Sequence, residues 1–208
     1  MLEKYKYILW DFDGVIMDSM PIRNQGFIEV LRSYPDEQVA QLMNYHLANG
    51  GLSRYVKFRY FFENIRGEEV SDIRIQELAD AFSKVMREQL INPKMIYQEV
   101  IEFIEKNCQK YPMHIVSGSD GNELRYITER MDIAKYFQSI QGSPTPKKEL
   151  VKNLIIEYNY PFQHCVLIGD SHNDLEAAEA NNIAFIGYNN KNLQTSNHDY
   201  IESFSTLL

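Results

Sequence analysis

The sequence predicts an α/β protein: a doubly wound, Rossmann-like parallel sheet core with an inserted small α-helical cap domain. Three observations support this fold class. Short continuous apolar runs recur along the chain, each bounded by polar residues or glycine, as in strands that are buried on both faces of a parallel sheet. Helical patterns alternate with the later runs. A stretch of about 70 residues after the first run has helical patterns and no convincing strand.

Four apolar runs are the expected strands of the sheet. They are residues 7–10, 114–116, 165–168 and 183–186. Between the later runs, helices are expected at residues 96–110, 122–131, 147–158 and 173–182. This alternation favours right-handed crossover connections, because a twisted strand that leads into a helix packs back onto the sheet with that hand.

Residues from about 20 to 90 interrupt this alternation. Helices are expected at residues 22–32, 36–47, 54–65 and 73–90, separated by the helix stops Tyr34-Pro35, Asn49-Gly50-Gly51 and Arg66-Gly67. An insert of this length exceeds what a connection needs. We therefore expect two domains: a core formed by residues 1–18 and 91–208, and a helical cap formed by residues 19–90.

Composition and charge limit the kind of protein. The chain has 208 residues, 44% of them hydrophobic, and a formal net charge of -8, which argues against binding to the phosphate backbone of nucleic acid. The N-terminus lacks a secretory signal pattern, and no apolar run is long enough to span a bilayer. Two cysteines, Cys108 and Cys165, fit buried reduced thiols. We expect a soluble, cytoplasmic protein that does not bind membranes; its oligomeric state stays open.

The stretch "ILWDFDGVIMDS", residues 8–19, places Asp11, Asp13 and Asp18 directly after the first apolar run. Three interpretations compete: a calcium loop, a polar turn and an active site. A calcium loop that begins at Asp11 needs glycine at its sixth position and glutamate at its twelfth, where this sequence has Ile16 and Ile22. A polar turn is as good as an active site if this stretch is taken alone.

A second acidic cluster favours the active site. Asp170 and Asp174, in "LIGDSHNDLEAA", follow another apolar run, and Ser117-Gly118 follows a third. Ligands bind beyond the carboxyl ends of parallel strands, so these groups should converge at one edge of the sheet. Carboxylates brought together there repel one another unless a cation offsets the charge, and Mg²⁺ is the natural candidate because it prefers oxygen ligands.

These motifs resemble those of the haloacid dehalogenase-like hydrolase superfamily, in the branch with a small helical cap that includes phosphoglycolate phosphatases and β-phosphoglucomutases. Four motifs occur in the order of the family: "DFDGVIMDS", "IVSGS", a lysine in "SPTPKKE", and "IGDSHND". The resemblance covers essentially the whole chain. It implies a Mg²⁺-dependent phosphatase that acts on a small phosphorylated metabolite.

The resemblance implies roles for the two aspartates of the first motif. Asp11 would be the nucleophile that forms an aspartyl-phosphate, which splits one difficult displacement into two easier ones. Asp13 would protonate the leaving oxygen and then activate the attacking water. Dehalogenases of this fold lack the second aspartate, because cleavage of a carbon–halogen bond needs no acid for the leaving group. Asp13 therefore points to phosphoryl transfer.

The remaining motifs would supply the metal and phosphate ligands. The Asp11 carboxylate, the Asp13 backbone carbonyl and Asp170 would hold Mg²⁺, with Asp174 assisting through water or as a neighbour of the ligands. Ser117 and the Gly118 amide would bind phosphoryl oxygens; for Ser117 alone, a strand-end turn is an equally good interpretation.

A lysine would balance the charge of the nucleophile and bind the transferred group. Relatives usually show Lys followed at once by Pro, whereas here the order is Pro146-Lys147-Lys148. We favour Lys147, because it keeps the spacing to the apolar pair Leu150-Val151 of the next helix; Lys148 stays an alternative.

In the insert, "NGGLSRYVKF" resembles the Gly-x-Ser-Arg cap segment of β-phosphoglucomutases. There Ser53 and Arg54 would contact the substrate, with Arg54 gripping a phosphate that is not transferred. A slightly better interpretation is that the glycines end one helix, Ser53 caps the next helix and Arg54 is solvated. His46, His172 and His198 are expected to be surface or packing residues.

Three functions are compatible with these residues. A phosphatase is the leading hypothesis. A phosphomutase of the β-phosphoglucomutase type would use the same aspartates and is supported mainly by Arg54. A phosphoaccepting receiver domain also uses clustered aspartates, Mg²⁺ and a lysine, but such domains are about half this length and carry no helical cap.

Overall fold

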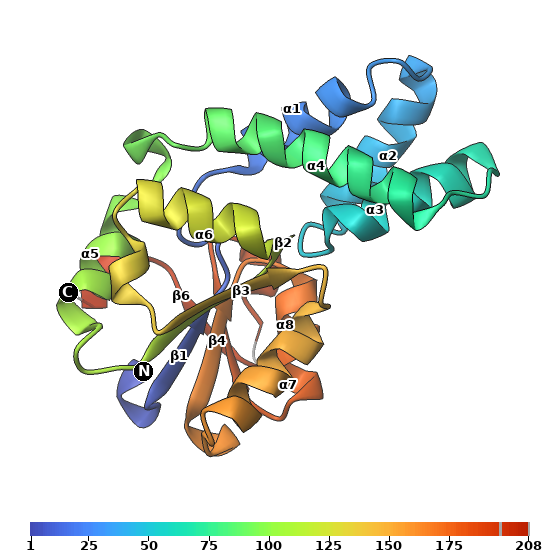
Figure 1. Ribbon diagram of the computed structural model, residues 1–208. Coiled ribbons are helices and arrows are strands. Elements are labelled where there is room, and N and C mark those ends of the chain that lie inside the picture. The colour runs from blue at the N-terminus through green and yellow to red at the C-terminus, as the bar shows by residue number, and fades with distance from the viewer. Residues whose placement is uncertain (196, 208) are drawn as a thin grey trace.

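A computed structural model describes residues 1–195 and 197–207 and contains one six-stranded sheet, in which every pair of neighbouring strands is parallel (Figure 1). The spatial order is β3-β2-β1-β4-β5-β6. The strands are β1 (Tyr7–Trp10), β2 (Met113–Asp120), β3 (Ser139–Ser143), β4 (Cys165–Gly169), β5 (Ala184–Tyr188) and β6 (Asp199–Ile201). The order reverses between β1 and β4, and such a switch point opens a crevice at the carboxyl ends of the strands.

Helices cover both faces of the sheet. They are α5 (Gln98–Asn107), α6 (Gly121–Arg130), α7 (Lys147–Glu157) and α8 (His172–Ala180). Ile8 and Trp10 of β1 belong to the apolar cluster that includes α5 and α6, and Leu9 belongs to the cluster under α7 and α8. Successive residues of β1 thus face opposite layers, which explains why its sequence is apolar throughout. The prediction of a doubly wound parallel sheet is confirmed.

Between β1 and β2 the chain forms a helical segment that lies at the carboxyl edge of the sheet (Figure 1). It contains α1 (Met20–Val30), α2 (Asp36–Ala48), α3 (Arg54–Tyr60), the π-helical turn η2 (Phe61–Arg66) and α4 (Asp72–Gln89). Aromatic rings pack these helices together: Phe27 of α1 contacts Phe58 of α3 and Phe82 of α4 at centroid distances of 5.3 and 4.6 Å. One apolar cluster includes these rings and the β1 side chains. The division into cap and core domains at residues 19 and 91 stays a prediction.

Element positions agree with the sequence patterns except at the sheet's outer strands. The eight expected helices and four expected strands occur, with ends shifted by a few residues; residues 54–65 form α3 followed by the π-helical turn. The strands β3 and β6 were not expected. β3 reads "SIQGS" and is mostly half-buried, and β6 has three residues, so neither carries the apolar run that predicts a strand buried on both faces. Within the described residues, no helix combines the length and apolar character required to cross a bilayer.

Candidate active site

A cavity of about 360 Å³ lies between the carboxyl ends of the strands and the helical segment. Its walls come from two sides. The strand-end side consists of the β1, β2 and β4 ends with the residues that follow them, and contributes Asp11, Asp13, Ser117, Gly118 and Asp170. The helical side contributes residues that include Arg23, His46, Gly51, Arg54 and Lys57. The two sides supply opposite charges to one cavity.

Asp11 lies where β1 ends. Its backbone N–H donates to the Ile168 carbonyl at 2.9 Å, which extends the hydrogen bonding between β1 and β4 by one residue and fixes the direction of the side chain. The buried Lys147 Nζ donates to Asp11 Oδ1 at 2.7 Å and to Asp174 Oδ1. Lys148, the next residue, is exposed. The structure therefore brings Lys147, not Lys148, to the predicted site.

Three carboxylates gather around this lysine. Asp11, Asp170 and Asp174 each offer an oxygen within 4.8 Å of the others. Burial raises the pKa of Asp11 and of Asp170, and the charges of the neighbouring carboxylates raise both further. Lys147 supplies one positive charge to this group of three. A buried, oxygen-rich cluster with such an excess of negative charge fits a divalent cation such as Mg²⁺.

Two glycines permit this close approach. Gly14 has φ +80°, and a Cβ there would lie 2.0 Å from Asp170 Oδ2. A Cβ at Gly169 would lie 2.4 Å from the Asp174 Cβ. Asp174 is held further by helix capping, because its carboxylate accepts from the Ser171 N–H at 3.0 Å while the Ser171 hydroxyl caps α8. Asp174 is therefore both a capping residue of α8 and a member of the carboxylate cluster.

Asp13, only two residues from Asp11, is not part of this cluster. Its carboxylate accepts hydrogen bonds from Arg23 Nε at 2.5 Å, from Ser119 Oγ at 2.6 Å and from the Ser19 hydroxyl. Burial alone would raise the pKa of Asp13, but the Arg23 guanidinium and the hydroxyl donors outweigh burial and hold that pKa below its usual value. In this structure Asp13 is therefore an ionised carboxylate paired with the helical side.

Ser117 and Gly118 lie within the last residues of β2. The Ser117 side chain is buried, and its Oγ accepts from the Ser119 N–H at 3.2 Å, which is the strand-end turn contact considered for it from the sequence. A Cβ at Gly118 would lie 2.2 Å from the Gly51 carbonyl oxygen. The glycine thus lets the loop between α2 and α3 rest directly on the end of β2, and this contact closes one wall of the cavity.

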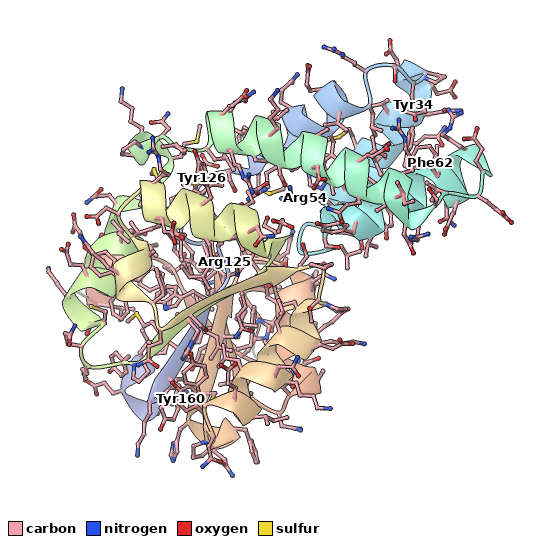
Figure 2. All side chains as sticks on the ribbon, in the orientation of Figure 1. Tyr34, Arg54, Phe62, Arg125, Tyr126 and Tyr160 are labelled. Carbon is pink, nitrogen blue, oxygen red and sulfur yellow. The ribbon has the colours of Figure 1, made fainter. Side chains whose placement is uncertain are left out.

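On the helical side, Ser53 and Arg54 have different surroundings. Ser53 is the N-cap of α3, with its Oγ 3.4 Å from the Val56 nitrogen. Arg54 is buried rather than solvated and lies between α4 and α6 (Figure 2). Its Nη1 and Nη2 donate to Glu123 of α6 at 2.6 and 2.8 Å, and Nη1 also donates to Ser83 at 2.7 Å. Arg54 lines the cavity, yet its guanidinium is engaged by a carboxylate of the protein.

Sequence reasoning missed four residues of this site. Arg23 bridges Asp13 and Glu123, which it contacts through Nη1 at 2.9 Å. Lys57 and His46 line the cavity and contact each other. Glu123 is fully buried, although at the start of α6 it has the pattern of a solvated acidic residue near a helix N-terminus. No local signal distinguishes these residues, because the groups they pair with belong to other elements of the fold.

Comparison with known proteins identifies the relatives of this chain. A family model described as "Haloacid dehalogenase-like hydrolase" matches residues 8–188. A phosphoglycolate phosphatase of Vibrio parahaemolyticus is 28% identical over 220 residues, covering 98% of this chain and 94% of the relative. A 5'-nucleotidase of Pseudomonas aeruginosa is 23% identical over 192 residues, covering 88% of this chain and 82% of the relative.

Solved structures share the fold over the full length. The crystal structure of a β-phosphoglucomutase from Clostridium difficile superposes with a TM-score of 0.77 at 15% identity and covers 98% of this chain and 93% of its own. Together with the family match, this confirms the resemblance inferred from the four motifs.

Proposed function

The chain belongs to the haloacid dehalogenase-like hydrolases, and we propose that it is a Mg²⁺-dependent phosphatase that cleaves a small phosphomonoester through a phosphorylated Asp11. One observation carries this proposal: a buried lysine lies between two members of a three-carboxylate cluster, at the strand ends where this fold binds ligands. The phosphatases among its relatives support the same reaction class.

The residues present suit a divalent metal. Asp11 and Asp170 would be ligands through their carboxylates and Asp13 through its backbone carbonyl, while Asp174 would orient the cluster through Lys147. When bound, Mg²⁺ would neutralise the cluster and lower the charge repulsion between the carboxylates and an approaching phosphate.

Asp11 would attack phosphorus with a carboxylate oxygen, forming a bond to the phosphoryl group as the bond to the leaving oxygen breaks. Lys147 would stabilise charge on the transferred group, together with Ser117 and the Gly118 amide. Water would then attack the phosphorus of the aspartyl-phosphate, releasing inorganic phosphate and restoring the Asp11 carboxylate.

Asp13 would give its proton to the leaving oxygen and later accept one from the attacking water. This role requires a movement, because the ion pair with Arg23 favours the ionised form of Asp13. We propose that Asp13 leaves Arg23, takes up a proton from water and turns toward the phosphoryl group as substrate binds. The helical segment, as a cap, would exclude water during this step.

The alternative functions have less support. A receiver domain is wrong, because the chain belongs to a hydrolase family and carries four helices between β1 and β2. The phosphomutase alternative rested mainly on Arg54, and Arg54 is paired with Glu123 in this structure. We therefore retain the phosphatase as the proposal.

The direct test is release of inorganic phosphate from sugar phosphates, phosphoglycolate and nucleotides, with Mg²⁺ and then with EDTA. We expect hydrolysis with Mg²⁺ that falls by at least about 10³-fold in EDTA and returns when Mg²⁺ is added back in excess. Mg²⁺ should also raise the melting temperature of the wild-type protein, and this rise should shrink in Asp170→Asn. Hydrolysis that is unchanged by EDTA would refute the metal assignment.

A further inference from the structure

We propose that Asn189 and Asn190, two consecutive residues directly after β5, are positioning residues for the metal site. Each side chain donates a hydrogen bond to the backbone of a different loop, and both loops carry proposed metal ligands. Neither residue belongs to the four sequence motifs. The inference rests on the proposed function and deepens it, because it assigns to two neutral amides the task of holding these loops around the divalent cation.

Asn189 holds the loop that follows β1. Its Nδ2 donates to the Gly14 carbonyl oxygen at 3.0 Å and to the Tyr97 hydroxyl at 2.9 Å, so both protons of the amide are used. Tyr97 in turn donates its backbone N–H to the Ile16 carbonyl oxygen at 3.0 Å. The loop is thereby held at two of its carbonyl groups.

Gly14 is the residue of this loop whose orientation matters most for a metal. It has φ +80°, and its N–H donates to the Met17 carbonyl oxygen at 2.8 Å. The same planar peptide contains the Asp13 carbonyl, the proposed metal ligand, so a rotation of Gly14 would also turn that carbonyl. With its N–H bonded to Met17 and its carbonyl bonded to Asn189, Gly14 is held on both sides.

Asn190 holds the loop that follows β4. Its Nδ2 donates to the Asp170 backbone carbonyl at 2.7 Å, while its Oδ1 accepts from the Asn192 N–H at 3.1 Å. The second contact makes Asn190 the N-cap of the 3-10 helix η6 (Lys191–Leu193) and fixes its side chain in one orientation. Because the Asp170 carboxylate belongs to the three-carboxylate cluster, a bond to its main chain limits where this carboxylate lies.

The two loops also contact each other. A Cβ at Gly14 would lie 2.0 Å from Asp170 Oδ2, so this carboxylate rests directly against the Gly14 backbone. In the sheet, β4 separates β5 from β1, and the bond from Asn189 therefore joins elements that strand pairing does not connect. One dipeptide thus holds both partners of the contact between Gly14 and Asp170.

The charge of the cluster explains why such support is useful. Asp11, Asp170 and Asp174 repel one another before a cation binds, and unsupported loops would move apart to relieve that repulsion. Binding would then include the free energy of bringing them back. Amides suit the task because they donate hydrogen bonds without adding a positive charge that competes with the cation. Groups that orient metal ligands typically contribute about 10- to 100-fold to metal affinity.

The experiment measures the Kd of Mg²⁺ by isothermal titration calorimetry, without substrate. Asn189→Gly removes the amide and keeps a residue that adopts a positive φ freely, which this position needs at φ +56°. Asn190→Ser removes the donor to Asp170 and keeps a hydroxyl that caps η6. We expect each variant to weaken Mg²⁺ binding by about 10- to 100-fold.

Two matched controls separate metal positioning from local stability. Asn182→Gly makes the first substitution at another exposed asparagine, which has φ +55°. Asn92→Ser makes the second at the N-cap of the 3-10 helix η3 (Pro93–Met95), where Asn92 Oδ1 accepts from the Lys94 N–H at 3.1 Å. Both controls should bind Mg²⁺ within about twofold of the wild type. A variant of Asn189 or Asn190 that also stays within twofold would overturn the role of that residue.

Hydrolysis provides a second measurement that a merely structural role would not change. For Asn189→Gly and Asn190→Ser, the Mg²⁺ concentration that gives half-maximal hydrolysis should rise by about the same factor as the Kd. At saturating Mg²⁺, kcat should return to within about threefold of the wild type, because the metal restores the arrangement of its ligands. A loss of kcat that excess Mg²⁺ leaves unchanged would contradict the positioning role.

Calorimetry needs no turnover, so failure of this inference is distinguishable from failure of the proposed function. If both variants weaken Mg²⁺ binding but no compound releases phosphate, the positioning role stands and the phosphatase fails. If phosphate is released with Mg²⁺ and both variants bind the ion as the wild type does, the phosphatase stands and the positioning role is overturned. A wild-type protein that binds no Mg²⁺ would overturn the positioning role as well.

Discussion

The two sides of the cavity balance their charges in opposite ways. On the strand-end side, the carboxylates of Asp11, Asp170 and Asp174 lie together, and one cation, Lys147, pairs with Asp11 and Asp174. On the helical side, the three cations Arg23, Arg54 and Lys57 face two carboxylates that come from outside the helical segment, Asp13 and Glu123. Counted as formal charges, the first side has an excess of negative charge and the second has an excess of positive charge.

The excess of carboxylates on the strand-end side indicates what would complete that side: a divalent cation would offset their charge. Asp13 connects the two sides, because it follows Asp11 along the chain and pairs with Arg23 across the cavity.

The largest effect is expected for Asp11→Asn, which removes the proposed nucleophile from the strand-end side. The amide cannot form the aspartyl-phosphate, so phosphate release should fall by at least about 10⁴-fold. The melting temperature should be unchanged or higher, because the cluster loses one of its repelling charges. Activity within tenfold of the wild type, in a folded variant, would exclude Asp11 as the nucleophile.

The second-largest effect is expected for Lys147, the cation that pairs with Asp11 and Asp174 on the strand-end side. Lys147→Ala should lower kcat/KM by about 10²- to 10³-fold, because it removes the group that stabilises charge on the transferred phosphoryl. Lys148→Ala is the matched control, and it should stay within about twofold of the wild type because Lys148 is exposed. A larger loss for Lys148→Ala would contradict the assignment.

On the helical side, Glu123→Gln tests whether one buried carboxylate holds two arginines. The loss of its charge leaves Arg23 and Arg54 less well balanced, and breaking a buried ion pair of this kind costs about 3–5 kcal/mol. Urea unfolding should show this decrease in the free energy of unfolding. Glu129→Gln, an exposed change on the same helix, should stay within about 0.5 kcal/mol. Equal stability of both variants would show that the ion pairs contribute little.

The smallest effect is expected away from the cavity, at Glu99 of α5. Burial alone would raise its pKa, but hydrogen bonds from Ser203, Ser205 and Tyr188 hold that pKa at about 2. Since the folded pKa lies below the unfolded one of 4.5, this carboxylate stabilises the fold above pH 4.5. The contribution is lost as the pH falls from 4.5 to about 2.

Glu99→Gln should therefore lower the free energy of unfolding by about 1–2 kcal/mol at pH 7, with the difference from the wild type vanishing in strong acid. Thermal unfolding measured across this pH range checks it. Glu102→Gln on the same helix is the control, and it should be nearly neutral at every pH. A Glu99→Gln deficit that persists undiminished in acid would assign its effect to packing rather than to charge.

Much of the strand-end side was predictable because its signals are local. The apolar run that forms β1 ends at Trp10, and Asp11 follows at once; the same relation holds for β4 and Asp170. A strand buried on both faces is recognisable from a few consecutive residues, and the carboxyl ends of parallel strands meet at one edge. The spacing of Lys147 to the next apolar pair favoured it over Lys148, and Lys147 is the lysine that contacts Asp11; its catalytic role stays a prediction.

The helical side was not predictable in the same way. Arg23 and Glu123 are 100 residues apart in the chain, and Arg54 and Glu123 are 69 apart. Viewed locally, Arg23 and Glu123 are ordinary polar residues near the start of a helix, and the segment that singled out Arg54 did not reveal its partner. The strands β3 and β6 were missed for a related reason: they have little apolar sequence, and pairing with β2 and β5 makes them strands.

The sequence by itself determined the doubly wound core, the helical insertion and the positions of the four motifs, because short-range sterics and burial leave a periodic trace in the chain. Only the tertiary structure decided that Asp13 turns to Arg23, that Glu123 engages Arg54, and that Lys57 is left without a carboxylate. The physical reason is that a buried charge is balanced by whatever group the fold brings within a few ångströms, and local sequence carries no record of that neighbour.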